Sequence, residues 1–306
     1  IKKNFNKINF NGSIFNTSYN FILLKNLDKK NITDIQIKFK DLNALIDSKF
    51  VIDKNNKNIF YGQNTLNFSG SKINTQYKIA DKLISFKSEN SKLNNKDFDY
   101  SGEINIDPFY YNINLEINSL NAFKTFDDLS NLKNLINEKI LLNKNFNGKL
   151  ELNINNLKGL KFFDKALIKT NIINGKLILN DSYLQSNKIG KLFIEESGIQ
   201  LKDNKRILKL KMFYKIFDQK KFYQKLQIPK NLRLNLNNIY FDLENHLDID
   251  EIILKELVLN KKTADKSINK SIDLTNSVDI NEIIKFKNWI ELKKFSNQIF
   301  SKINLD

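Results

Sequence analysis

Cysteine is absent from the chain of 306 residues, and histidine, arginine and proline are scarce. Without cysteine, disulfides, thiolate metal sites and cysteine nucleophiles are excluded. The single histidine, His246, excludes histidine-based catalytic triads and histidine-rich metal sites. No apolar run in the sequence approaches the ~18 residues that a membrane-spanning helix needs.

The net charge of +16 is carried almost entirely by lysine, since Arg206 and Arg233 are the only arginines. Lysine, asparagine, isoleucine and phenylalanine all have A/T-rich codons, so a biased genome explains this composition without selection for charge. Arginine is also the preferred residue for contacts with phosphates and base edges. The composition therefore argues against specific nucleic-acid binding, while the 24 phenylalanines argue against wholesale disorder.

Alternation of apolar and polar residues dominates the chain and predicts many antiparallel strands with one apolar face. Turn signals rich in Asn, Gly and Lys separate the runs, at 54–58, 69–71, 94–96, 202–205 and 236–238. Pro108 lies inside the alternating stretch 100–120, where the apolar positions change from even to odd. We interpret Pro108 as a bend or bulge within one long strand of a curved sheet.

Two segments have helical spacing instead. Residues 123–142 place Asp127 and Asp128 early, as suits a helix N-terminus, and residues 279–303 carry the only tryptophan. The polar stretch 261–278 is predicted to be a linker that follows one continuous module over 1–260. The predicted fold class is mainly β: an elongated, curved, largely antiparallel sheet forming an apolar groove (a β-taco or repeating β-groove), with a helix near 123–142 and a C-terminal helix near 279–303.

Several stretches resemble the AsmA-like proteins, bacterial relatives of the bridge-like lipid-transfer proteins. "FDYSGEINIDPFYYNINLEI", 98–117, resembles the Gly-plus-Pro-Phe strand pair of that family, and 82–100 is similar to its short strands about S-x-L turns. Residues 146–184 and 190–260 resemble the C-terminal AsmA-like region, in which strands begin at glycine, as in "NGKLIL". The family's N-terminal membrane segment is not in this sequence, and 261–306 has no feature that aligns.

The resemblance implies a non-enzymatic lipid-binding and transfer protein of the Gram-negative envelope. It would conduct phospholipid acyl chains along an apolar β-groove between inner and outer membrane, from the periplasm, with an inner-membrane anchor upstream of residue 1. The implied partners are phospholipids, the membrane and an envelope protein, with no cofactor and no catalytic or metal site. Two alternatives stay open: a periplasmic scaffold or outer-membrane assembly factor that binds a protein through the same sheet, and a secreted β-rich adhesin.

The candidate lining of the groove consists of apolar residues from the alternating runs. They are Ile104, Ile106, Tyr111, Ile113, Leu115, Ile117, Leu150, Leu152, Ile154, Leu177, Leu179, Leu208, Leu210, Met212, Leu232, Leu234, Leu236, Phe241 and Leu243. In the last helix, Phe286, Trp289, Ile290 and Phe295 form a candidate membrane-proximal face. The alternative for this helix is a cap on the open end of the sheet, which we favour.

Three polar or basic stretches could have a function, but each is better explained by a structural role. The acidic cluster 242–251 around His246 offers oxygen ligands for calcium but lacks the EF-hand spacing, so we interpret it as a solvated strand–turn–strand. The pair Glu195 and Glu196 is interpreted as surface charge. The basic and aromatic stretch 209–230 either contacts lipid head groups or an anionic membrane, or is a strand leading into a half-buried turn, which we favour.

Overall fold

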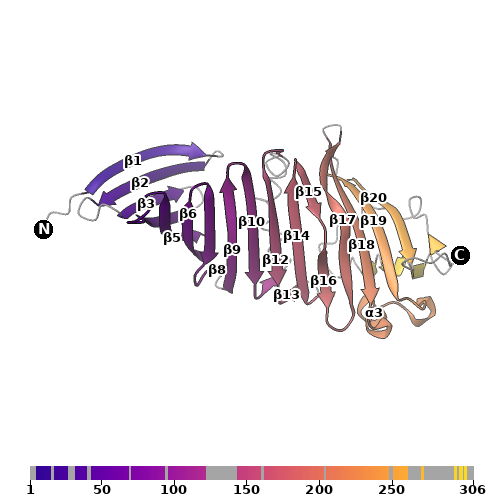
Figure 1. The fold of residues 1–306 in the computed structure, drawn as a ribbon. Coiled ribbons are helices and arrows are strands. Elements are labelled where there is room, and N and C mark those ends of the chain that lie inside the picture. The colour runs from indigo at the N-terminus through magenta and orange to yellow at the C-terminus, as the bar shows by residue number, and fades with distance from the viewer. Residues whose placement is uncertain are drawn as a thin grey trace. The chain divides into compact units, whose positions relative to one another are not determined.

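The computed structural model divides the chain into two compact units, Ile1–Asn118 and Ser119–Asp306, called unit 1 and unit 2. It describes residues 5–14, 17–26, 32–39, 43–68, 70–93, 96–121, 143–159, 162–202, 205–247, 251–260, 270–271, 293–294, 296–298 and 300–301. Both units are built mainly of antiparallel strands (Figure 1). The prediction of a mainly β, largely antiparallel chain is confirmed.

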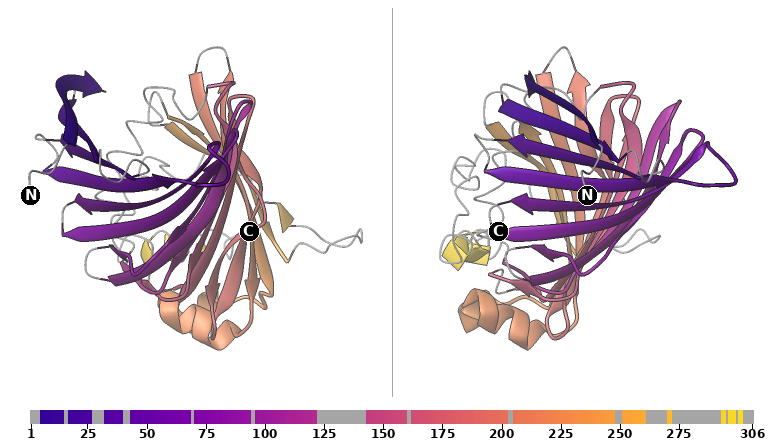
Figure 2. Two further views of the ribbon diagram at one scale, coloured as in Figure 1. Left: turned by 60° about the vertical axis from the view of Figure 1, so that its left-hand side comes forward. Right: turned by 90° about the vertical axis from the view of Figure 1, so that its left-hand side faces the viewer.

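Unit 1 is an antiparallel meander, in which each strand pairs with the next along the chain except at β7 and β8. Its strands are β1 (Phe5–Ile14), β2 (Thr17–Asn26), β3 (Ile32–Phe39), β4 (Ala44–Ile52), β5 (Ile59–Phe68), β6 (Ser71–Ala80), β7 (Leu83–Ser88), β8 (Lys92–Leu93), β9 (Lys96–Ile106) and β10 (Phe109–Ile117). Strands β7 and β8 lie one after the other between β6 and β9. The strands curve and twist, as Figure 2 shows for the indigo to purple part of the ribbon.

The stretch around Pro108 is a hairpin between β9 and β10 and not one bent strand, so that prediction is wrong. Asp107 and Pro108, joined by a cis peptide bond, form the turn, and Ile106 pairs with Phe109 across it. In this register each even-numbered residue of β9 pairs with an odd-numbered residue of β10. Ile104, for example, pairs with Tyr111 and shares its face. The change of apolar parity therefore comes from a reversal of the chain. Pro108 has no N–H to donate and is suited to this turn.

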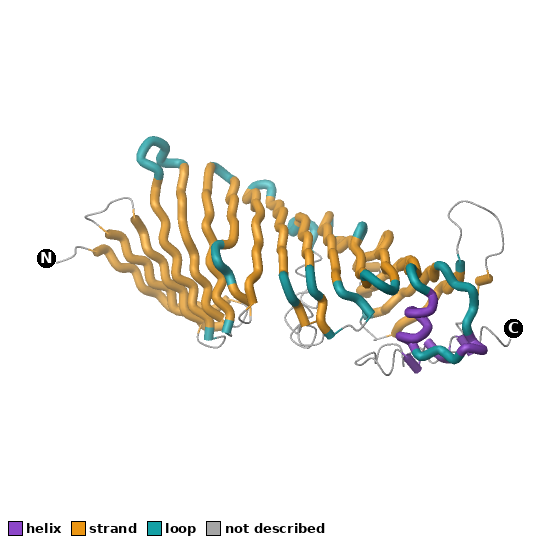
Figure 3. Tube along the Cα trace, turned by 90° about the horizontal axis from the view of Figure 1, so that it is seen from below, coloured by secondary structure: helices purple, strands orange, loops and turns teal. Residues whose placement is uncertain are grey.

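Unit 2 contains further antiparallel strands and a short parallel pair. Its strands are β11 (Leu120–Asn121), β12 (Asn147–Ile154), β13 (Leu157–Lys158), β14 (Lys165–Ile173), β15 (Lys176–Leu179), β16 (Ser182–Ser186), β17 (Gly190–Lys202), β18 (Lys205–Ile216), β19 (Asn238–His246), β20 (Glu251–Leu259) and β21 (Lys270–Ser271). The strand order is β12, β14, then β15 and β16 together, β17, β18, β19, β20 and β21, and β11 pairs with β13 in parallel. Figure 3 shows these strands in orange, the loops in teal and the helices in purple.

Buried serines repair the ladder where a strand is interrupted. At the break between β7 and β8, Ser91 Oγ accepts from the N–H of Asn74 and donates to its carbonyl, both at 2.9 Å. At the break between β15 and β16, Ser182 Oγ does the same for Lys169, at 2.7 and 3.2 Å. A hydroxyl that both donates and accepts can replace the backbone groups that the break removes.

The bulge in β17 uses the same device. Ser197 Oγ accepts from the N–H of Lys211 at 2.8 Å, and its hydroxyl can donate to the carbonyl of Glu195 at 2.8 Å or to that of Lys211 at 3.3 Å. The residue before each of the three serines has a positive φ, namely Asn90, Asp181 and Glu196. The sequence reads S-x-L at Ser91 and at Ser182, and at each of these breaks the serine hydroxyl pairs the N–H and C=O of one residue on the neighbouring strand.

Helix α3 (Gln219–Leu226) and the 3-10 helix η2 (Lys230–Leu232) follow β18 and cover one end of the sheet in unit 2. Asp218 caps α3 by accepting from the N–H of Lys221 at 2.9 Å. The core here gathers Phe162, Tyr214, Ile216, Phe222, Tyr223, Leu226, Ile228, Leu236, Ile239, Leu257, Leu259 and Phe300. The polar and basic segment after β18, which contains α3 and η2, thus covers the apolar side chains at one end of the sheet in unit 2.

The two helices predicted from the sequence fall largely on residues that are not described. The segment 123–142 lies outside the described residues, as do Phe286, Trp289, Ile290 and Phe295. The described residues 293–294, 296–298 and 300–301 are helical. No helix among the described residues is long and apolar enough to cross a membrane. The predicted module over 1–260 and the linker over 261–278 stay predictions.

Candidate functional site

The register of unit 1 sorts its side chains onto two faces, because directly paired residues of neighbouring antiparallel strands share a face. One face, here called the apolar face of unit 1, is built from rows that cross the strands. One row runs from β1 to β6 through Phe10, Phe21, Ile37, Ile46, Leu66 and Ile73. A second runs from β4 to β10 through Ile52, Phe60, Ile79, Ile84, Ile104 and Tyr111.

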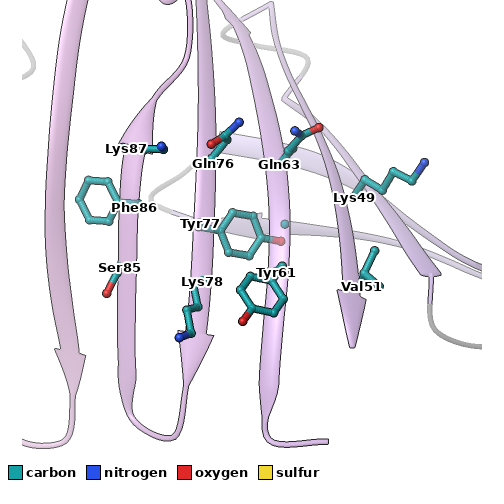
Figure 4. A pocket seen from close by; sticks show the side chains of 11 residues that line it. Lys49, Val51, Tyr61, Gln63, Gln76, Tyr77, Lys78, Ser85, Phe86 and Lys87 are labelled. Carbon is teal, nitrogen blue, oxygen red and sulfur yellow. The ribbon is translucent and has the colours of Figure 1, made fainter. Parts of the chain in front are cut away.

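The opposite face of unit 1, here called the polar face, carries charged and amide side chains. Its central row is Asp34, Lys49, Gln63, Gln76, Lys87 and Ser101. Figure 4 shows four of them side by side, with Val51, Tyr61, Lys78 and Ser85 in the next row. These side chains line an open depression of about 600 Å³. One face is therefore fit for water and the other for apolar material.

The apolar face of unit 1 is not covered by a second layer within the described residues. Unit 1 has no described helix, and its described strands form one sheet. Ile8, Phe10 and Ile106 on this face keep exposed fractions of 56%, 45% and 51%. A β-sandwich of this size would instead bury such residues against a facing sheet. Within the described residues, part of the apolar face is therefore exposed, as at interaction sites, while Tyr111 and Ile117 on the same face are buried.

Glycines let aromatic rings lie flat on the apolar face. Gly12, Gly62 and Gly102 pair directly with Tyr19, Tyr77 and Phe86, and a Cβ on any of them would collide with the partner's ring. In Figure 4 the ring of Tyr77 extends from β6 toward β5. Each ring thus covers the glycine of the neighbouring strand and adds apolar area at a position that has no side chain of its own.

Most of the predicted lining residues share one face within their own unit. In unit 1, the six residues on β9 and β10 all lie on the apolar face; they are Ile104, Ile106, Tyr111, Ile113, Leu115 and Ile117. In unit 2, ten residues on β12, β15, β18 and β19 share an equivalent apolar face; they are Leu150, Leu152, Ile154, Leu177, Leu179, Leu208, Leu210, Met212, Phe241 and Leu243.

The strand predicted at Leu232, Leu234 and Leu236 is wrong. Leu232 ends η2, and the following residues to Leu236 form an irregular segment that precedes β19. Leu236 is fully buried, and the other two pack against the same core. Their alternation arises because an extended loop between two packed elements also buries every second side chain. They belong to the cap of the sheet end.

The stretch 209–230 contains a helix that the alternation had concealed. Phe222 and Tyr223 of α3 are buried in the core, whereas Phe217 is half exposed just before the helix begins. Asp218 in front of a helical pattern was the available signal. With Phe222 and Tyr223 in the core, the helix of this stretch caps the sheet end.

The described part of the C-terminal helix packs on this cap. The rings of Phe300 and Tyr223 lie 5.6 Å apart, edge to face. Lys293 Nζ donates to Gln227 Oε1 at 2.7 Å, and Figure 3 shows the helical segments close together. These contacts agree with a capping role for the residues that are described.

The polar constellations do not assemble into a reactive site among the described residues. No group of three or more metal-ligating side chains occurs in the part of the chain that the structure describes. In the acidic cluster 242–251, the chain positions 248–250 lie outside the described residues. Glu196 forms an ion pair with Lys211 at 2.8 Å, and this hydrogen bond and charge lower the pKa of the exposed Glu196 carboxyl. Glu195 and Glu196 are surface groups.

Comparison of the sequence with protein-family models and with curated proteins finds no matching family model and no matching curated protein. The resemblance to AsmA-like proteins thus rests on the residue pattern described above, and the functional argument rests on the sheet faces of the two units.

Proposed function

We propose that the protein binds the acyl chains of glycerophospholipids on the apolar faces of its sheets and passes them along the rows of apolar side chains. The observation that carries the proposal is the apolar face of unit 1, which no described layer covers. Neither of its two long rows contains a charged side chain. Each CH₂ moved from water to such a surface gains roughly 0.8 kcal/mol, so acyl chains are suitable occupants.

The dimensions of unit 1 suit a chain that moves along the face. From β1 to β10 there are eight inter-strand steps, because β7 and β8 occupy one position. At about 4.8 Å per step, the apolar face extends for about 38 Å across the strands, and each of its two long rows, with five steps, extends for about 24 Å. That is more than the ~15 Å of one leaflet's hydrocarbon, half of a typical bilayer core. A lipid on this path slides between equivalent positions and is not held at one.

The opposite, lysine-bearing face is suited to water. Head groups would stay at the rim, in solvent, while the tails lie on the apolar side. In unit 2 the apolar face is covered at β18 to β20 by α3 and the segment before β19, which gives this face a closed end. From the resemblance to AsmA-like proteins we further propose that the protein acts in the periplasm of a Gram-negative bacterium, is held by an inner-membrane anchor and has a role in outer-membrane biogenesis.

Lipid extraction tests the proposal. Residues 1–306 would be purified without detergent and bound lipids identified by mass spectrometry. The variant Ile113→Asp/Leu115→Asp charges the apolar face of β10, and Asn112→Asp/Asn114→Asp places the same charges on the polar face of the same strand. We expect phospholipid with the wild type and the second variant, and a loss of several-fold or more with the first. A folded wild type free of lipid would favour a scaffold whose apolar face binds a protein.

A further inference from the structure

A polar row interrupts the apolar face of unit 1. Ser48 on β4, Asn64 on β5, Thr75 on β6 and Ser88 on β7 are directly paired in sequence across the strands. The row lies between the two long apolar rows described above. A surface that only lets acyl chains slide needs no such row, so its polar groups require another explanation.

Two tyrosines reach across a strand to the hydroxyls of this row. Tyr77 on β6 lies over Gly62, and its hydroxyl is 3.1 Å from Ser48 Oγ on β4. Tyr100 on β9 hydrogen-bonds with Thr75 Oγ1 on β6. The hydroxyls of Ser48 and Thr75, which lie on either side of Asn64 in the row, are therefore both hydrogen-bonded to tyrosines.

The central residue, Asn64, keeps a buried polar atom without a partner. Its Oδ1 is shielded from solvent and has no hydrogen bond among the described residues. A buried acceptor left in this state is costly, and native structures rarely tolerate it without a reason. The ring of Tyr77 crosses β5 at Gly62, two residues from Asn64 on the same face, so its side chain lies beside this row.

We infer that Ser48, Asn64 and Thr75 form a binding site for a free hydroxyl group carried by a lipid chain that lies on the apolar face. A hydroxyl both donates and accepts, so it can bond with the amide of Asn64 and with the hydroxyl of Ser48. The side chains of the site are uncharged, and this selects a neutral group over a phosphate or a carboxylate. The lipid class that carries such a hydroxyl on a neutral head group beside its acyl chains is diacylglycerol, whereas a lysophospholipid would bring its charged head group onto the apolar face. The inference rests on the proposed function, since it needs an acyl chain on this face.

The test compares an alcohol with its methyl ether. Binding of 1-dodecanol and 1-methoxydodecane to the full chain would be measured by displacement of a fluorescent fatty-acyl probe. We expect the wild type to prefer the alcohol about tenfold, the ratio that one hydrogen bond provides. The variant Asn64→Leu should lose the preference and still bind the ether. Asn67→Leu, on the polar face of the same strand, should keep it.

The outcomes separate the two claims. Equal binding of alcohol and ether by the wild type would overturn the hydroxyl site and leave acyl-chain binding intact. Absence of binding of either ligand and of the probe would overturn the proposed function itself. In the same assay, a diacylglycerol should bind more tightly than a diacyl phosphatidylcholine, and a lysophospholipid should have no such advantage. A diacylglycerol that binds no better than the diacyl phosphatidylcholine would also contradict the inference.

Discussion

Replacing Tyr214 with phenylalanine is expected to stabilise the protein, whereas the same change at Tyr223 is expected to destabilise it. Both tyrosines are buried, with exposed fractions of 4% and 3%, and both contact the ring of Phe222. The hydroxyl of Tyr214 has no partner among the described residues. The hydroxyl of Tyr223 donates to the carbonyl of Leu234 at 2.7 Å and accepts from its N–H at 3.1 Å.

The magnitudes follow from these partners. An unsatisfied buried polar group costs about 1–3 kcal/mol, so Tyr214→Phe should raise the free energy of unfolding by about 1 kcal/mol. Tyr223→Phe leaves the backbone groups of Leu234 unpaired and should lower it by about 1–3 kcal/mol. The two variants remove the same atom from neighbouring rings of one core. Their difference therefore measures hydrogen bonding, with the apolar packing held constant.

Urea denaturation followed by circular dichroism checks this prediction. Equal m-values would establish that the same amount of surface is exposed on unfolding in the wild type and both variants. A loss of 1 kcal/mol or more with Tyr214→Phe would refute the reasoning, because the hydroxyl would then have a favourable partner. Equal effects of the two substitutions would refute it as well.

Three further predictions concern the ladder, the rings and the pH. Ser182→Ala should lower the free energy of unfolding by about 1–3 kcal/mol, because it leaves the backbone N–H and C=O of Lys169 unpaired, as urea titration would measure. Gly62→Ala should cost about 1–3 kcal/mol by displacing the ring of Tyr77, and a double-mutant cycle should show a smaller cost in a Tyr77→Ser background. Burial raises the pKa of Tyr214, so the unfolded chain loses this proton at a lower pH than the folded chain does. The free energy of unfolding is therefore unaffected by this group below the unfolded pKa of about 10 and declines as the pH rises from there toward the folded value. The urea midpoint should fall above about pH 10, and less steeply in Tyr214→Phe.

Matched controls make these results decisive. Ser101 is an exposed serine on the polar face of β9, and Ser101→Ala should change the free energy of unfolding by less than about 0.5 kcal/mol. A loss equal to that of Ser182→Ala would contradict the role given to the buried serine. Additive effects of Gly62→Ala and Tyr77→Ser would show that ring and glycine do not interact.

Alternation was sufficient to predict the faces of the strands, because a strand of period two places every second residue on one side whatever its neighbours are. This is why predicted residues as far apart as Leu150 and Met212 lie on one apolar face of unit 2. The hairpin at Pro108 was misread as a bend for a related reason. A two-residue turn and a one-residue bulge both shift the apolar parity, and only pairing partners distinguish them.

Helix α3 was missed because its eight residues include only three buried side chains, Phe222, Tyr223 and Leu226. So short a segment, between alternating runs, offers too few turns for helical spacing to stand out. The polar row could not be foreseen either. Ser48, Asn64 and Thr75 come from three different strands, and only their register brings them together.

Site-specific photo-crosslinking tests the central claim most directly. Two pairs of adjacent aromatic residues point to opposite faces of unit 1: Phe60 and Phe109 lie on the apolar face, Tyr61 and Tyr110 on the polar face. Each would be replaced in turn by p-benzoylphenylalanine, and the protein irradiated with phospholipid vesicles. The account predicts phospholipid adducts at Phe60 and Phe109 and none at Tyr61 and Tyr110. Adducts confined to Tyr61 and Tyr110, or equal at all four positions, would contradict it.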